Sequence, residues 1–417
     1  MKVVILAGGK GTRIASLDAT VPKPMIRICA KPILQWQIEC LHRQGYDDIT
    51  IVVGYMGQTI KDYFGSGSVL GVSINYITET EPLGTAGALY FLRDIITSDF
   101  LLLNGDIIFD IEIDRFYSCH KKHGGIATIF THPNDHPYDS GIIVADENDC
   151  VTAWLHKEEP RLWYKNRVNA GLHILSPSIL GFFSQPRKTD LDRDILKPLI
   201  AGKQLYTYDS PEYVKDMGTP ERYHQVERDI MQGKVKAKNL SFPQKAVFFD
   251  RDGTLNRNVE FLRNIDALEL LPGAAEMIKK VNEAGYLAIV VTNQPVIARG
   301  EVTWEELNEI HNKLETLLGQ QGAYLDDIFV CPHHPDKGFP GERVAYKIDC
   351  TCRKPKPGML LKAAEKYNID LSESYMVGDT DRDIMAGEAA GCKKCIKIDS
   401  AFTCNTINLE QTSENRV

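Results

Sequence analysis

Short runs of β-branched and aromatic residues alternate with helical stretches along most of this chain of 417 residues. The strand candidates of the first half are VVIL, ITIVV, VSINYI, FLLLN and IATIF, and those of the second half are AVFF, YLAIVVTN, DDIFVC, SYMVGD and CIKI. Strands that alternate with helices build a parallel sheet covered by helices. The pattern therefore restricts the chain to the α/β class and predicts one such core in each half.

The alternation weakens between residues 233 and 245, where GKVKAKNLSFPQK is basic, lacks an apolar period and contains Pro243. Domain boundaries fall in linkers of this composition. We predict a first domain at 1–235, a linker at 236–244, a second domain at 245–400 and a polar tail at 401–417. The length of the chain also favours two domains over one.

The composition is that of a soluble globular protein, with 43% hydrophobic and 25% charged residues. No apolar run approaches the roughly 20 residues of a membrane span. Met1 leads directly into VVIL without a basic flank, so we expect no secretory signal and a cytoplasmic location. Ten cysteines are then interpreted as reduced thiols or metal ligands. The net charge of −8 argues against a nucleic-acid partner but permits small phosphorylated ligands. The oligomeric state is undetermined.

Polar residues follow several strand candidates of the second half. Ligands of open parallel sheets gather at the carboxyl ends of the strands, so these residues are candidates for one site. Two carboxylates after a single strand, in FFDRDGTLN, repel each other unless a divalent cation binds them. The candidates are Asp250 and Asp252, then Thr292 and Asn293, then Arg353 and Lys354, and finally Asp379 and Asp383.

The segments DRDGT, VTN, CRKP and GDTDRD resemble, in this order, the four motifs of the haloacid dehalogenase superfamily of phosphatases. The resemblance implies that Asp250 is the nucleophile and becomes an aspartyl phosphate. It implies that Asp252 protonates the leaving alcohol and later activates water. For this, Asp252 must hold a proton while Asp250 does not.

The same resemblance implies a magnesium ion bound by Asp250, the Asp252 carbonyl and Asp379. Asp383 is expected to brace these ligands rather than to bind the ion. The residues implied to neutralise the phosphoryl group are Thr292 and Lys354, and those implied to contact the substrate are Asn293 and Arg353.

A second cluster in this half combines CPHHP with CTC. Cys331, His333, Cys350 and Cys352 can form a tetrahedral zinc site of three thiolates and one histidine, with His334 as the competing ligand. We expect such a zinc ion to be structural. The CKKC segment at 392–395 is interpreted as ordinary packing, because it spans a helix end and a strand start.

The zinc loop narrows the resemblance to phosphatases similar to histidinol phosphatase and heptose 1,7-bisphosphate phosphatase. Only 42 positions separate Asp250 from Thr292, which is too few for a separate cap domain. We therefore expect an open, capless Rossmannoid domain with the zinc loop at its rim. One departure is Pro295 and Val296 after TNQ, where relatives tend to have Ser-Gly.

In the first half, LAGGKGTR follows the first strand candidate. It lacks the third glycine of the dinucleotide-binding pattern and the Gly-Lys-Ser/Thr ending of a P-loop. With VPKPM, EPLGTAGAL, NGDIIF, NAGLHIL and KDMGTPERY, it resembles the Rossmann-like sugar-1-phosphate nucleotidyltransferases over about 230 residues. The glycine loop with its Pro-Lys-Pro and the four later segments make five motifs in the family's order, and this makes the resemblance specific.

The resemblance implies that the glycine loop lets backbone N–H groups approach a nucleoside triphosphate, whose charge Arg13 and Lys23 neutralise. Asp106 and Asp216 would share one magnesium ion. Lys157 is implied to contact the sugar phosphate, while His156 stands where a glutamate is common. The glycines of the loop are Gly8, Gly9 and Gly11, and the residues implied to line the sugar and base pocket are Gly84, Thr85, Gly87 and Asn169.

Together, the two halves resemble consecutive enzymes of GDP-heptose biosynthesis. This resemblance implies removal of the C7 phosphate of D-glycero-α-D-manno-heptose 1,7-bisphosphate, followed by transfer of GMP from GTP to heptose 1-phosphate. The segment ETEPLGTAGAL resembles that of mannose-1-phosphate guanylyltransferases, which favours GTP as the nucleotide. Pyrimidine-specific relatives differ from it by few residues. The alternative is a mannose-1-phosphate guanylyltransferase joined to a phosphatase similar to histidinol phosphatase. A scaffold protein with inactive sites would have lost catalytic acids, and none is lost.

Overall fold

The computed structural model describes residues 1–9, 18, 20–399, 407 and 409. It divides into two compact units, each described here by itself. The first unit contains Met1–His132, Ile143–Trp154 and Asn169–Asn239. The second contains Leu240–Val417 and also takes two segments from the first half of the chain, Pro133–Ile142 and Leu155–Val168.

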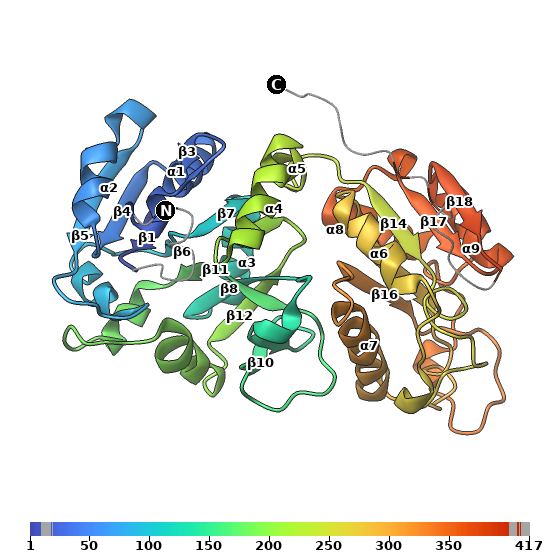
Figure 1. Ribbon diagram of the computed structural model, residues 1–417. Coiled ribbons are helices and arrows are strands. Elements are labelled where there is room, and N and C mark those ends of the chain that lie inside the picture. Colours follow the sequence, from blue (N-terminus) through green and yellow to red (C-terminus); the bar gives the residue numbers. More distant parts are fainter. Residues whose placement is uncertain (10–17, 19, 400–406, 408, 410–417) are drawn as a thin grey trace. The chain divides into compact units, whose positions relative to one another are not determined.

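A twisted sheet organises the first half, and in the described part of the chain it has nine strands (Figure 1). Seven of them follow the order β10-β9-β11-β6-β1-β4-β5, β8 pairs with β11, and β12 pairs with β8. The strands are β1 (Lys2–Ala7), β4 (Asp48–Val53), β5 (Ser73–Thr78), β6 (Phe100–Asn104), β8 (Ala127–His132), β9 (Ile142–Ala145), β10 (Val151–Leu155), β11 (Val168–Leu175) and β12 (Leu205–Asp209).

The prediction of a purely parallel sheet is wrong for this half. β1 runs parallel to β4 and β6, but β11 runs antiparallel to β6 and β9. A parallel neighbour requires a long crossover, usually through a helix. No α-helix lies among the residues between β8 and β11, all of which the structure describes, so the chain reverses there instead.

Among the described residues of the first half, two small strand pairs and five α-helices accompany this sheet. β7 (Ile107–Asp110) pairs antiparallel with β13 (Tyr213–Asp216), and β2 (Arg27–Ile28) pairs with β3 (Lys31–Pro32). The described helices are α1 (Ile33–Arg43), α2 (Gly57–Phe64), α3 (Ile113–His123), α4 (Pro220–Met231) and α5 (Lys234–Ala237). The helix α5 lies inside the segment we interpreted as irregular, because lysine and alanine both favour helix.

The sheet of the second unit is parallel throughout, in the order β16-β15-β14-β17-β18. Val247 and Phe249 pack on one face with residues of α6 and α7, while Ala246 and Phe248 pack on the other with residues of α8 and α9. Both faces are therefore covered, which explains the continuous apolar runs. The elements are β14 (Ala246–Phe249), β15 (Leu287–Asn293), β16 (Asp327–Cys331), β17 (Tyr375–Gly378), β18 (Lys394–Lys397), α6 (Ala274–Glu283), α7 (Trp304–Gly319), α8 (Gly358–Tyr367) and α9 (Asp381–Ala390).

Local sequence signals set the start of two helices in this unit. A capping box of Thr303 and Glu306 begins α7, and one of Thr380 and Asp383 begins α9. Between Asp250 and Thr292 the chain forms loops, the turn Ile265–Ala267, α6 and most of β15, without a separate domain. None of the described helices combines the length and apolar character needed to span a membrane.

Two candidate active sites

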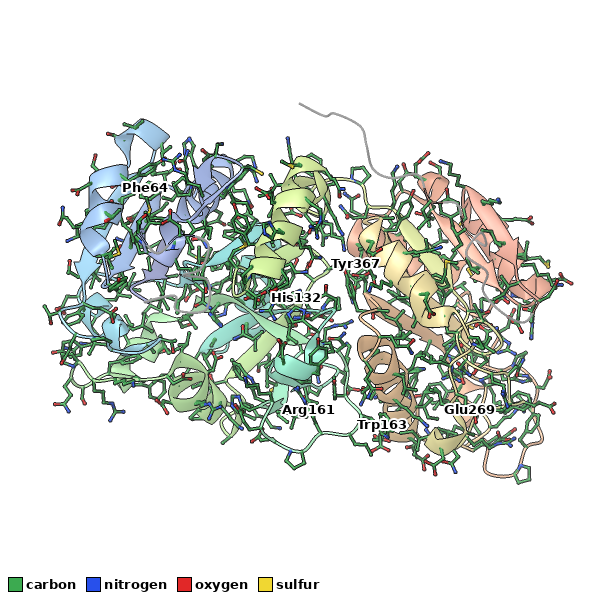
Figure 2. The ribbon with its side chains drawn as sticks, in the orientation of Figure 1. Phe64, His132, Arg161, Trp163, Glu269 and Tyr367 are labelled. Carbon is green, nitrogen blue, oxygen red and sulfur yellow. The ribbon has the colours of Figure 1, made fainter. Side chains whose placement is uncertain are left out.

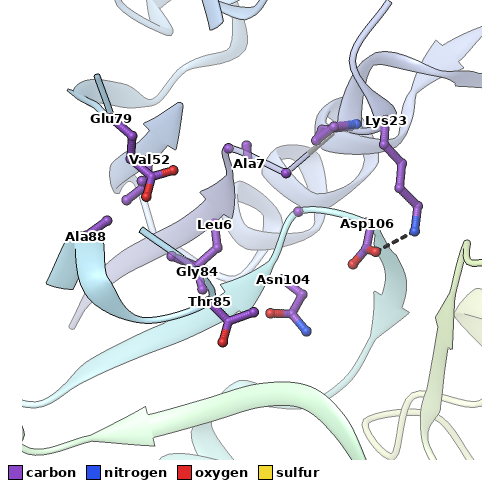
Figure 3. Close-up of a pocket in the computed structure, with 14 residues that line it drawn as sticks. Leu6, Ala7, Lys23, Val52, Glu79, Gly84, Thr85, Ala88, Asn104 and Asp106 are labelled. Atoms are coloured by element: carbon purple, nitrogen blue, oxygen red, sulfur yellow. Dashed lines mark hydrogen bonds and ion pairs between the residues drawn. The ribbon is translucent and has the colours of Figure 1, made fainter. Parts of the chain in front are cut away.

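A pocket of about 350 Å³ opens at the carboxyl ends of β1, β4 and β6 in the first unit (Figure 3). This volume falls in the range of small-molecule sites. Ala7 ends β1, Asn104 ends β6, and Glu79 directly follows β5. The sequence-predicted residues that line the pocket are Gly8, Gly9, Lys23, Gly84, Thr85 and Asp106.

Close approaches favour glycine at two of the predicted positions, and at Gly84 the neighbour is backbone that cannot move aside. A Cβ on Gly8 would lie 2.2 Å from Glu79 Oε2, and one on Gly84 would lie 2.5 Å from the Thr189 carbonyl oxygen. Gly84 also has a φ of +80°, a conformation that side chains disfavour. Glycine therefore lets the backbone pass close to Glu79 at Gly8 and close to the Thr189 backbone at Gly84.

Of the two acids predicted to bind magnesium, Asp106 directly precedes β7 and Asp216 ends β13, the strand paired with β7. Asp216 is the register partner of Ile107, and the Met217 amide donates to the Asp106 carbonyl at 2.8 Å. Each carboxylate is paired with a cation. Lys23 Nζ lies 2.5 Å from Asp106 Oδ2, and Arg222 Nη1 lies 2.8 Å from Asp216 Oδ1 (the lysine pair is dashed in Figure 3). Adjacent, partly exposed carboxylates of this kind fit a hard divalent cation.

Several predicted residues lie elsewhere. Gly11 and Arg13 are outside the described residues, and Lys157 is an exposed residue of a segment that belongs to the second unit. Gly87 packs against the Arg187 carbonyl, and the Asn169 amide nitrogen lies 3.3 Å from Asp192 Oδ1.

Glu79 lines the pocket although we did not predict it, and burial raises the pKa of its carboxyl. Its position two residues after the strand candidate VSINYI was the available signal.

In the second unit, Asp250 follows β14 and meets a buried lysine. Lys354 Nζ lies 2.7 Å from Asp250 Oδ1 and 2.6 Å from Asp383 Oδ1. Both Lys354 and Asp383 are almost fully buried. The other Asp383 oxygen accepts hydrogen bonds from the amide and hydroxyl of Thr380. Asp383 therefore holds Lys354 toward Asp250, as expected of a bracing residue.

Asp379 lies beside this pair, and oxygens of Asp250, Asp379 and Asp383 all lie within 4.8 Å of one another. Asp379 Oδ1 is buried and has no hydrogen-bond partner among the described residues. A Cβ on Gly253, whose φ is +83°, would lie 2.1 Å from Asp379 Oδ2. An unpartnered carboxylate oxygen among further carboxylates fits a magnesium ion.

Asp252 is held from three sides. Arg251 Nη2 donates to its Oδ2 at 2.7 Å, Asn256 Nδ2 to its Oδ1 at 3.0 Å, and Gln294 Nε2 to its Oδ2 at 2.7 Å. Burial acts to raise the pKa of Asp252, but Arg251 and these hydrogen bonds outweigh it and hold the pKa below its usual value. Burial raises the pKa of Asp250 to about 6, against the opposing effect of Lys354.

Without substrate or metal, the pKa of Asp250 therefore lies above that of Asp252, which is the reverse of the order that the resemblance implies for the reaction. The physical reason is burial of Asp250 among other acids, whereas Asp252 has a guanidinium beside it. A bound magnesium ion would favour ionised Asp250.

Four residues that support this site were missed. Arg251 is fully buried between Asp252 and His311, whose Nε2 accepts from Arg251 Nη1 at 3.0 Å. Gln294 also donates to Thr292 Oγ1 at 2.9 Å. The DRD and TNQ segments contain Arg251 and Gln294, but His311 and Asn256 carry no sequence signal of their own.

Asn293 and Arg353 position the loop that carries Lys354. The Asn293 side chain accepts from the Lys354 amide at 3.0 Å and donates to its carbonyl at 3.1 Å. Arg353 Nη1 donates to the His333 carbonyl at 3.1 Å, so it connects this loop to the cysteine cluster. Pro295 and Val296 are buried, and Val296 packs with Ile297 in a small apolar cluster.

The structure brings Cys331, His333, Cys350 and Cys352 together, with ligand atoms within 4.8 Å of one another. The three sulfur–sulfur distances are 3.6, 3.2 and 3.2 Å, and His333 Nδ1 lies 3.3 Å from Cys352 Sγ. Thiolates at about 2.3 Å from one zinc ion lie about 3.7 Å apart in a tetrahedron. His334 instead accepts from the Asp336 amide, which favours His333 as the fourth ligand.

Comparison with known proteins finds one family model for each half of the chain. The model of nucleotidyl transferases matches residues 2–233, which is more than half of the chain. The chain belongs to the nucleotidyl transferase family. The model of haloacid dehalogenase-like hydrolases matches residues 214–391, so a hydrolase domain of that type follows the nucleotidyl transferase domain. The predicted two-domain α/β fold class is confirmed.

Mannose-1-phosphate guanyltransferase of Eremothecium gossypii is 36% identical over 230 residues, which are 54% of this chain and 63% of that protein. The chain thus spans less than two thirds of this curated relative. HddC from Yersinia pseudotuberculosis, solved with GMP-PN, is 27% identical and has a TM-score of 0.48; it covers 55% of this chain and 99% of its own. D,D-heptose 1,7-bisphosphate phosphatase from B. bronchiseptica, solved with magnesium and phosphate, is 38% identical and has a TM-score of 0.32; it covers 36% of this chain and 79% of its own.

Proposed function

We propose that the chain is a bifunctional enzyme that removes the C7 phosphate of D-glycero-α-D-manno-heptose 1,7-bisphosphate and then transfers GMP from GTP to the remaining anomeric phosphate. The observation that carries this proposal is the presence of both sites in one chain. The acid cluster around Asp250 and Lys354 is suited to phosphate release, and the pocket with Lys23 and Asp106 is suited to a nucleotide. The product of the phosphatase reaction keeps its anomeric phosphate and is therefore the substrate of the transferase reaction.

In the phosphatase reaction, a carboxylate oxygen of Asp250 attacks phosphorus, and the bond between phosphorus and the sugar oxygen breaks. The anionic phosphate of a bound substrate raises the pKa of Asp252 and favours its protonated form. Asp252 then gives this proton to the departing alkoxide and takes one from the water that hydrolyses the aspartyl phosphate. Lys354 and Thr292 neutralise the phosphoryl oxygens. Magnesium, held by Asp250, the Asp252 carbonyl and Asp379, supplies further charge neutralisation when bound.

In the transferase reaction, an oxygen of the sugar phosphate attacks the α-phosphorus of GTP, and pyrophosphate leaves without a covalent enzyme intermediate. Gly8 and Gly9 line the pocket without side chains, so their backbone can approach the nucleotide, and Lys23 carries positive charge beside Asp106. Magnesium, held by Asp106 and Asp216, supplies charge neutralisation at the phosphates when bound. The curated relatives named as mannose-1-phosphate guanyltransferases support GTP as the nucleotide.

The decisive experiment supplies the α-anomer of the heptose bisphosphate with each nucleoside triphosphate in turn. Phosphorus NMR should show loss of the C7 phosphate, survival of the anomeric phosphate and, with GTP, a GDP-sugar. Loss of the anomeric phosphate in the first step would refute the coupled pathway.

The second candidate is a mannose-1-phosphate guanylyltransferase joined to a phosphatase with a separate substrate, such as histidinol phosphate. The 36% identity to guanyltransferases of that name favours it. Competing mannose 1-phosphate against heptose 1-phosphate, with GTP in both cases, separates the two, because the preferred sugar has the higher kcat/KM.

We predict that each chain holds one zinc ion at the cysteine cluster, and that its role is structural. Cys350→Ser should lower the zinc content and loosen the loop that carries Arg353 and Lys354, because a closed zinc site stabilises the chain around it. Metal analysis after dialysis and hydrogen exchange of residues 331–357 measure both effects. Cys392→Ser, outside the cluster, is the control, and less than half an equivalent of zinc in the unmodified protein would contradict the prediction.

We also predict that Arg353 holds the anomeric phosphate while the C7 phosphate faces Asp250. Loss of one charge-assisted contact in Arg353→Ala should cost about 2 to 3 kcal/mol, or a rise of about 30- to 150-fold in KM for the bisphosphate. A simple monophosphate ester should be much less affected. Steady-state kinetics on both substrates test this, and an equal rise in both KM values would instead indicate general damage to the loop.

A further inference from the structure

We propose that Arg167, which lies within the nucleotidyl transferase match, is a positioning residue for the phosphatase. The inference rests on the proposed role of Asp252 as proton donor. Arg167 belongs to a segment, Leu155–Val168, that the structure assigns to the second unit, where it contacts α7. That helix in turn holds the arginine that orients Asp252.

The segment is anchored on α7 by buried polar contacts. Arg167 Nη1 lies 3.3 Å from Glu315 Oε2, and both side chains are nearly inaccessible to solvent. The Asn166 amide donates to the same Glu315 oxygen at 3.0 Å, and the Tyr164 amide donates to Thr316 Oγ1 at 2.9 Å. A buried carboxylate requires such partners, because losing them leaves an uncompensated charge.

Further contacts hold both segments against α7 and the chain that follows it. Arg167 Nη2 donates to the Asp326 carbonyl at 2.7 Å. A Cβ on Gly319 would lie 2.8 Å from Pro137 Cγ, so glycine lets Pro133–Ile142 approach the end of α7. Trp163, labelled in Figure 2, lies with its ring 5.4 Å from Lys313 Nζ of the same helix. Pro133–Ile142 and Leu155–Val168 therefore both contact α7.

One turn earlier, the same helix contacts Arg251, which in turn binds Asp252, the proposed proton donor. His311 and Glu315 are four residues apart in α7, a spacing that places them on one face. His311 is neutral, since burial lowers its pKa to about 3, and its Nε2 can therefore accept from Arg251. Arg251 uses its other nitrogens on Asp252. A shift of α7 would displace Arg251 and with it Asp252.

Poor placement of a proton donor has a selective kinetic signature. An alkoxide leaving group requires the proton, whereas 4-nitrophenoxide leaves readily without it. The value of kcat/KM reports formation of the phosphoenzyme, the step in which the leaving group departs. A purely structural defect would lower kcat/KM equally for both kinds of ester.

The test compares glycerol phosphate with 4-nitrophenyl phosphate in the full-length protein. Arg167→Met should lower kcat/KM about tenfold for the alkyl ester and less than twofold for the nitrophenyl ester. Arg167→Lys, which keeps the charge opposite Glu315, should recover part of the loss. If Arg167→Met does not fold, Glu315→Gln gives the same comparison while keeping an acceptor for the Asn166 amide.

Two further variants make the result decisive. Lys245→Met removes a different ion pair of the unit, 3.4 Å from Glu373, and should show no ester selectivity. Asp252→Asn should show the same selectivity as Arg167→Met with a larger loss. For Arg167→Met, an equal loss on both esters or no loss at all would overturn the inference about Arg167. The proposed role of Asp252 would be unaffected. Absence of selectivity in Asp252→Asn would overturn the proposed role of Asp252 itself.

Discussion

Asp250→Asn is expected to reduce phosphate release by at least about a thousandfold, because it removes the proposed nucleophile. The substitution also removes negative charge from the cluster of Asp250, Asp379 and Asp383 that is expected to bind magnesium. Lys354 keeps its contact with Asp383, so the loop should remain in place. Phosphate release from the sugar bisphosphate, measured with magnesium present, tests this expectation.

The control is Asp381→Asn, which makes the same chemical change at an exposed aspartate paired with Lys397. It should retain phosphatase activity. In Asp250→Asn, pyrophosphate release from GTP and sugar 1-phosphate should also continue, because the proposed transferase residues come from other motifs. A folded Asp250→Asn protein that lost both activities would disprove the assignment of separate chemistry to the two sites.

Asp106→Asn is expected to have the converse effect and to reduce pyrophosphate release by at least about a hundredfold. It weakens a proposed magnesium ligand and leaves Lys23, which is 9% exposed, without its carboxylate partner at 2.5 Å. Phosphate release should continue at the rate of the unmodified protein. Coupled detection of pyrophosphate, with GTP and the sugar 1-phosphate at saturation, measures the loss.

Asp48→Asn is the matched control, since Asp48 pairs with Lys2 at 3.1 Å outside the pocket. It should change neither activity. Thermal melting of Asp106→Asn distinguishes a lost ligand from a lost fold, and circular dichroism before the transition gives a second check. Normal transferase activity in a stable Asp106→Asn protein would remove Asp106 from the proposed site.

Local patterns were sufficient for much of the architecture. The β-branched runs predicted five of the nine described strands of the first sheet and all five of the second, because residues buried on two faces of a sheet leave a continuous apolar signature that needs no long-range information. They did not predict β9, β10, β11 or β12 as strands. The haloacid dehalogenase motifs predicted Asp250, Lys354 and Asp379 as neighbours, since carboxyl ends of parallel strands meet at one edge of a sheet. The cysteine spacing likewise predicted the cluster, but left His333 and His334 as alternatives.

Other features depend on contacts between distant parts of the chain. The reversal of β11 follows from a connection without an α-helix, and the choice of His333 follows from the contact of His334 with Asp336. The pKa order of Asp250 and Asp252 depends on burial and on the orientation of Arg251, neither of which is encoded in residue spacing.

The sequence by itself determined the fold class, the two-part organisation and the chemical groups of each site, because these depend on periodicity and on residue type near strand ends. Only the tertiary structure decided that Leu155–Val168 contacts α7 and that Arg167 meets Glu315. These residues are 148 positions apart. No local pattern links them, since a buried ion pair between distant segments arises only when the folded chain removes both charges from water.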